Sequence, residues 1–126
     1  MMSPGNRRPD ALRILGLARR AGAVALGAEA VREGLRRDGL ALVLLAVDAA
    51  PGQAGKVERL LRHGAVRWRR YGTRLELGAA VGGPPLAAIG VTRSGFADRL
   101  LEELDAEAGS REGEPRALED DQTYAG

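Results

Sequence analysis

The sequence predicts an α/β protein, a three-layer α/β/α sandwich with a mixed sheet of about four strands. Segments with apolar residues at helical spacing alternate along the chain with short strand-like segments. Two of the latter, 40–47 and 86–91, are almost wholly apolar, which is typical of strands covered by helices on both faces. A length of 126 residues suits one domain with a single core.

Five helical segments are expected, and most have recognisable ends. Asp10 is a capping residue for the first, and Gly22 ends it. Thr73 and Glu76 form the T-x-x-E pattern of a capping box before the fourth, and Ser94 is expected to cap the fifth. The predicted helices span 11–21, 28–38, 55–63, 74–81 and 95–105, with Pro51 and Gly52 taken as a break before the third.

Four strand segments are expected, at 23–26, 40–47, 66–70 and 86–91. The third alternates, with Val66 and Trp68 facing inward and Arg67 and Arg69 outward, so it is expected to be half exposed. The segment 82–85, Gly-Gly-Pro-Pro, can only be a loop.

Charge divides the chain into a basic domain and an acidic end. Residues 1–100 hold 17 Lys/Arg and 8 Asp/Glu, a balance of +9, whereas the remaining residues hold 2 Arg and 9 acidic residues, a balance of −7. We expect a flexible basic arm at 1–9, a domain at 10–105 and a disordered acidic tail at 106–126. The tail either keeps the protein in solution or folds back to compete with phosphates. In the second case, if the phosphates belong to a nucleic-acid partner such as RNA, deleting the tail is expected to tighten its binding at low salt.

Composition excludes many kinds of catalytic and metal site. The chain has no cysteine and one histidine, His63, so thiolate chemistry and multi-histidine metal sites are excluded. Neither common glycine-rich phosphate loop is present. Asp48 follows a buried strand, a frequent site position, but a turn or capping role explains it equally well. We expect no enzyme activity, no cofactor and no bound metal.

No apolar run approaches the roughly 20 residues that span a bilayer, and no apolar segment of a signal peptide follows Arg7 and Arg8. The expected compartment is the cytoplasm, with no membrane partner, and the expected state is a monomer.

Arginine favours a nucleic-acid partner, since 18 of the 19 basic residues are Arg. The guanidinium suits phosphates and base edges, although a GC-rich coding sequence produces the same bias. Aromatic residues are 3% of the chain, too few for a base-stacking platform, so RNA contact through loops and helix ends is expected. The basic candidates on predicted helices and strands are Arg13, Arg19, Arg20, Arg32, Arg36, Arg67 and Arg69.

Four segments together resemble one family. They are L-R-I-L-G-L-A-R-R-A-G at 12–22, L-L-A-V-D-A-A-P at 44–51, Y-G-T-R-L-E-L-G at 71–78 and G-V-T-R-S-G-F-A-D at 90–98. They are similar to the kink-turn-binding ribosomal proteins (L-seven-Ae, L-thirty-e and the Gadd-like superfamily), and most of all to the bacterial YlxQ-like branch. The resemblance implies an α/β/α sandwich, non-catalytic binding of structured RNA and association with ribosomes or ribonucleoproteins.

The resemblance also implies an RNA site on two loops. The family reads RNA with a G-x-N-E-x-x-K pattern entering the second helix, where this chain has G-A-E-A-V-R-E, so Gly27 matches. Glu29, Ala30 and Glu33 replace the Asn, Glu and Lys. The resemblance implies that RNA is bound by Gly27, Ala28, Glu29, Arg32 and Arg36. It also implies that a second loop packs on unstacked bases, with the residues Gly83, Pro84, Pro85 and Leu86. The replaced residues favour an alternative, a protein-interaction module on the same fold.

Overall fold

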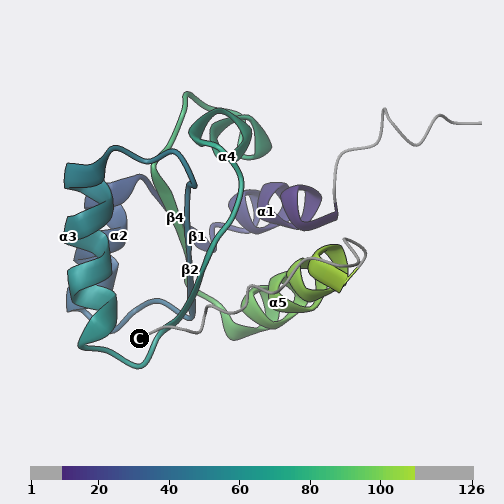
Figure 1. The fold of residues 1–126 in the computed structure, drawn as a ribbon. Helices are drawn as coiled ribbons and strands as arrows, with labels where there is room; N and C mark the ends of the chain where they lie inside the picture. The colour runs from purple at the N-terminus through teal and green to yellow at the C-terminus, as the bar shows by residue number, and fades with distance from the viewer. Residues whose placement is uncertain (1–9, 110–126) are drawn as a thin grey trace, which may run out of the picture.

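The computed structural model describes residues 10–109; the predicted arm at 1–9 and residues 110–126 of the predicted tail lie outside this range. Five helices alternate with four strands over these residues (Figure 1). In chain order the elements are α1 (Asp10–Arg20), β1 (Val24–Leu26), α2 (Ala28–Arg36), β2 (Leu42–Leu45), α3 (Pro51–Arg62), β3 (Arg67–Arg70), α4 (Arg74–Ala80), β4 (Ala88–Val91) and α5 (Ser94–Gly109).

The strands form one mixed sheet in the order β1-β4-β2-β3. Strand β4 is antiparallel to both of its neighbours, whereas β2 and β3 run parallel. Leu42 of β2 lies opposite Val91 of β4 and Arg67 of β3, which fixes the register of the three strands. Every residue of β2 and β4 is buried, as the two apolar runs predicted.

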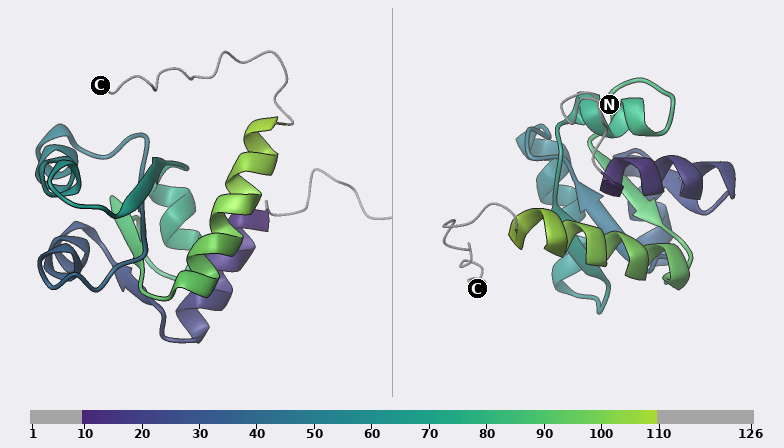
Figure 2. Two further views of the ribbon diagram at one scale, coloured as in Figure 1. Left: turned by 90° about the horizontal axis from the view of Figure 1, so that it is seen from below. Right: turned by 90° about the vertical axis from the view of Figure 1, so that its right-hand side faces the viewer.

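Helices cover both faces of the sheet, so the predicted three-layer sandwich is confirmed (Figures 1 and 2). Helices α1, α4 and α5 lie on one face, over a core that includes Leu44. Helices α2 and α3 lie on the other, over a core that includes Val43 and Leu45. Neighbouring residues of β2 therefore point into different cores, because side chains alternate along a strand.

Several predicted boundaries differ from the observed ones. Helix α3 begins at Pro51, four residues before the predicted start, because proline fits the first helical position, where its missing N–H needs no acceptor. Helix α5 begins at Ser94 itself, since the N–H of Ala97 donates to the carbonyl of Arg93 (3.1 Å). Strands β2 and β4 are also shorter than the apolar runs that contain them.

The predicted boundary between the domain and the tail at residue 105 is displaced as well, because α5 continues to Gly109. In its last turn, the Glu107 carboxylate accepts a hydrogen bond from the Tyr71 hydroxyl (2.8 Å) and one from the N–H of Ala11 (3.4 Å). These contacts tie the last turn of α5 to the residue that follows β3 and to the first turn of α1. This part of the predicted tail therefore belongs to the folded domain.

Candidate nucleic-acid interface

The two loops that the sequence singled out lie side by side at one end of the sheet. Gly27 connects β1 to α2 with a φ of 96°, in the left-handed region that glycine tolerates. Its N–H donates to the carbonyl of Ala88 (2.9 Å). A Cβ added to Gly27 would lie 3.8 Å from the Cδ2 atom of Leu86. The pairing of β1 with β4 produces this proximity, because it sets Leu26 opposite Ile89.

The second loop, 83–86, is held against α4. The N–H of Gly83 donates to the carbonyl of Gly78 (2.9 Å). A Cβ on Gly78 would overlap the Pro84 carbonyl oxygen, so the loop rests directly on the helix backbone. Gly83, Pro84 and Pro85 are exposed and Leu86 is half-buried. The loop therefore presents a fixed apolar surface.

The first residue of α4 joins this loop to the segment that follows β2. The backbone N–H of Arg74 donates to Asp48 Oδ1 (2.8 Å), and its carbonyl accepts from the N–H of Leu86 (3.0 Å). The predicted capping box is confirmed, with Thr73 Oγ1 accepting from Glu76 N (3.1 Å) and Glu76 Oε1 from Thr73 N (2.9 Å). Asp48 thus acts as a second cap for α4, one of the two roles the sequence left open.

Sequence reasoning missed two apolar side chains next to these contacts. Val47 precedes Asp48 and is 54% exposed, and Leu75 follows Arg74 and is 68% exposed. By pattern both belong to apolar or helical runs that predict core positions. Their exposure becomes visible only when the ends of β2 and α4 are placed in the fold. Together with Leu86, they make this edge of the molecule apolar as well as loop-rich.

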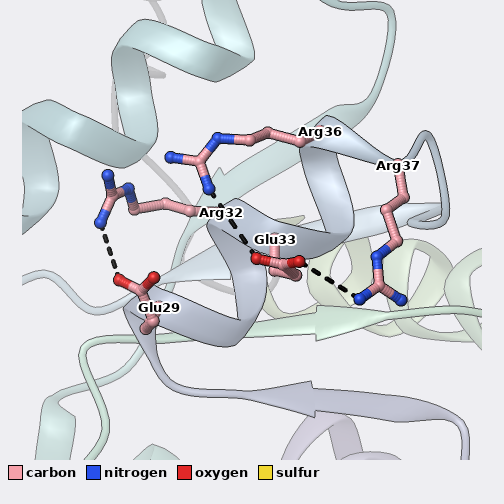
Figure 3. Close-up of polar contacts among 5 residues, drawn as sticks. All are labelled: Glu29, Arg32, Glu33, Arg36 and Arg37. Carbon is pink, nitrogen blue, oxygen red and sulfur yellow. Dashed lines mark hydrogen bonds and ion pairs between the residues drawn. The ribbon is translucent and has the colours of Figure 1, made fainter.

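The arginines of α2 are paired with acidic residues of the same helix (Figure 3). Arg32 contacts Glu29 at 2.8 Å, and Glu33 contacts Arg36 at 3.9 Å and Arg37 at 3.2 Å. Because these carboxylates offset part of the positive charge, a phosphate has to compete with them for the guanidinium groups.

Arg32 and Arg36 extend from α2 on the side that faces α3. There they line a cavity of about 180 Å³ with Lys56, Arg59 and Leu60. Sequence reasoning missed Lys56 and Arg59 as partners of the α2 arginines. Nothing in the spacing links residues 20 or more positions apart, and only the packing of α2 on α3 brings them together.

The other predicted basic residues do not join this face. On α1, in the opposite layer, Arg13 pairs with Asp10 (2.7 Å) and Arg19 Nε donates to the carbonyl of Val81 (3.3 Å). On β3, Arg67 pairs with Asp98 of α5 (3.2 Å). The candidate interface therefore comprises the Gly27 and Leu86 loops and the adjoining face of α2.

Within residues 10–109, no three His, Asp or Glu side chains are grouped as metal ligands would be. Over the same residues, no helix has the length and apolar character needed to cross a bilayer.

Comparison with known proteins finds one curated relative and several solved structures of the same fold. The RNA-binding protein YlxQ of Bacillus subtilis (strain 168) is 35% identical over 92 residues, which are 73% of this chain and 92% of the relative. No family model matches the chain.

The solved structures agree with this relationship. A protein of unknown function from Bacillus halodurans C superposes with a TM-score of 0.73 at 30% identity, over 78% of this chain and 99% of that one. The Giardia lamblia 15.5kD RNA binding protein superposes with a TM-score of 0.66 at 16% identity, over 83% of this chain and 96% of that one. The second likeness concerns the fold alone.

Proposed function

Because the chain belongs to the L-seven-Ae-like family, in the YlxQ branch, we propose that it is a non-catalytic protein that binds structured RNA. The RNA we propose is of the kink-turn type, and the setting is cytoplasmic, on the ribosome or another ribonucleoprotein. The name of the Bacillus subtilis relative, an RNA-binding protein, supports an RNA partner.

The observation that carries the proposal is the juxtaposition of Gly27 and Leu86. A bent RNA presents both base-pair edges and unstacked bases within a small area, and proteins read such RNA by shape and by its splayed bases. Gly27 has no side chain to hold a strand away, and Glu29 beside it accepts hydrogen bonds from base amino groups. Leu86, Val47 and Leu75 supply apolar surface for unstacked bases.

The helix that follows Gly27 adds a polar component. The first N–H groups of a helix have no acceptor inside the helix and favour anions such as phosphates. In α2 the first internal bond runs from the N–H of Val31 to the carbonyl of Gly27 (3.0 Å). The N–H groups of residues 28–30 therefore point away from the helix, beside the Leu86 loop.

A second candidate function is a protein-interaction module on the same fold. The ion pairs of α2 favour it, because Glu29 and Glu33 occupy positions where the family has an Asn that reads bases and a Lys. Under this alternative, the apolar edge formed by Val47, Leu75 and Leu86 contacts a protein surface.

A gel-shift titration separates the two functions. The full chain is titrated against a kink-turn RNA and against a plain duplex of equal length, each at a low and a moderate salt concentration. RNA recognition predicts at least about tenfold tighter binding to the kink-turn, which is about 1.4 kcal/mol. Equal affinity for both RNAs, or no shift at low salt, contradicts the proposal and favours the protein-interaction module.

A further inference from the structure

A groove between α2 and α3 is lined by positively charged side chains and lies apart from the Gly27 and Leu86 loops. Its walls are Arg32 and Arg36 from α2 and Lys56 and Arg59 from α3, with Leu60 between them. The two helices lie side by side on one face of the sheet (Figures 1 and 2). We propose that this groove binds the phosphodiester backbone of an RNA strand that leaves the Gly27–Leu86 edge. This inference rests on the RNA-binding function proposed above.

The α3 side of the groove has uncompensated charge. Within residues 10–109, no acidic side chain lies within 4.0 Å of Lys56 or Arg59. The acidic residue that separates them in sequence, Glu58, is engaged by Arg70 of β3 at 2.6 Å. Like charges held together on neighbouring helices repel one another, and an anion placed between them relieves this repulsion.

On the α2 side of the groove, the ion pair with Glu29 does not use all the hydrogen-bond donors of Arg32. Arg32 uses one terminal nitrogen for Glu29, and its Nε is buried with no hydrogen-bond partner in the described part of the chain. A buried donor without an acceptor costs about 1–3 kcal/mol. Phosphate oxygens accept from two guanidinium nitrogens at once, so a phosphate that draws Arg32 out of its present position satisfies this donor.

The size and lining of the groove indicate which part of the RNA binds there. A cavity of about 180 Å³ has room for a phosphate and part of its sugar, but none of its lining residues is aromatic, so a base has nothing to stack on. Four cations with no acceptor among the lining side chains suit a polyanion read by charge alone. The contact therefore adds affinity and orientation rather than sequence preference.

The test removes the two unpaired cations and follows the salt dependence of binding. Lys56→Ala/Arg59→Ala in the full chain is compared with Arg93→Ala/Arg99→Ala, which removes the same charge from exposed residues at or beside α5, in the opposite layer. Each protein is titrated with the kink-turn RNA between low and moderate salt, and thermal unfolding verifies that both variants fold.

The proposal predicts that the slope of log affinity against log salt falls by about two for the groove variant and stays near the wild-type slope for the α5 variant. Affinity at low salt falls by about tenfold or more in the groove variant alone. Equal slopes and affinities in the two variants overturn the inference while leaving RNA binding intact, as expected if the groove holds an acidic protein segment instead. A wild-type protein that binds no RNA overturns both proposals.

Discussion

The Tyr71 hydroxyl donates a 2.8 Å hydrogen bond to the carboxylate of Glu107, 36 residues further along the chain. Tyr71 directly follows β3, and Glu107 lies in the last turn of α5. The same carboxylate reaches the N–H of Ala11 in the first turn of α1, where helix N–H groups lack internal acceptors. One side chain thus joins α5 to α1 and to the segment that connects β3 with α4.

This relationship predicts that Tyr71 and Glu107 are coupled in stability. Removing the hydroxyl with Tyr71→Phe is expected to lower the free energy of unfolding by about 1.5–3 kcal/mol, because the bond joins a partly buried hydroxyl to a charged acceptor. Urea unfolding of Tyr71→Phe, Glu107→Ala and the double variant measures the coupling in a double-mutant cycle. If the two single effects simply add, the hydrogen bond does not stabilise the domain.

Two helical glycines are expected to respond oppositely to alanine. A methyl group on Gly78 would overlap the Pro84 carbonyl oxygen, whereas one on Gly55 meets no atom within 4 Å. Gly78→Ala should therefore cost about 1–3 kcal/mol, the usual result of overpacking. Gly55→Ala should add about 0.5–1 kcal/mol, because alanine loses less backbone entropy in a helix. Thermal unfolding of both variants provides the measurement.

The same pair of glycines also tests the role of the 83–86 loop. Because Gly78→Ala must displace Pro84 from α4, it should weaken RNA binding, while Gly55→Ala in α3 serves as the matched control. Unchanged RNA affinity in a folded Gly78→Ala protein would separate the loop from the binding site.

Most of the fold follows from local pattern. The two apolar runs identify β2 and β4 as buried strands, and the T-x-x-E motif at Thr73 marks the start of α4. The end of α5 cannot be predicted from local pattern. Glu107 is a charged residue in an acidic stretch, and its structural role depends on contacts with Tyr71 and Ala11. A boundary fixed by a long-range contact leaves no local signal.

Only part of the candidate site is predictable from the sequence, because only part of it has local sequence signals. Glycine at position 27 and the Gly-Pro-Pro loop are local signals, and the antiparallel pairing of β1 with β4 brings them together. The groove between α2 and α3 exists only because these two helices are neighbours in the fold. The sequence around Lys56 and Arg59 therefore does not predict it. The exposure of Leu75 likewise depends on what the rest of the fold leaves uncovered.

The acidic residue at position 33 is expected to limit RNA affinity. Its carboxylate holds Arg37 at 3.2 Å and lies 3.9 Å from Arg36, so it occupies two cations and repels phosphates at the same time. Glu33→Ala should tighten binding of the kink-turn RNA by about three- to tenfold at low salt, and the gain should shrink as salt screens the charges.

The matched control for this variant is Glu102→Ala, which removes the same charge from an exposed position on α5. Its effect should be small, because α5 and α2 cover opposite faces of the sheet. An equal gain in both variants would indicate a dependence on net charge rather than on the α2 arginines. Weaker binding in Glu33→Ala would mean that the carboxylate itself contacts the RNA, since the loss of an exposed helical ion pair costs less than about 1 kcal/mol.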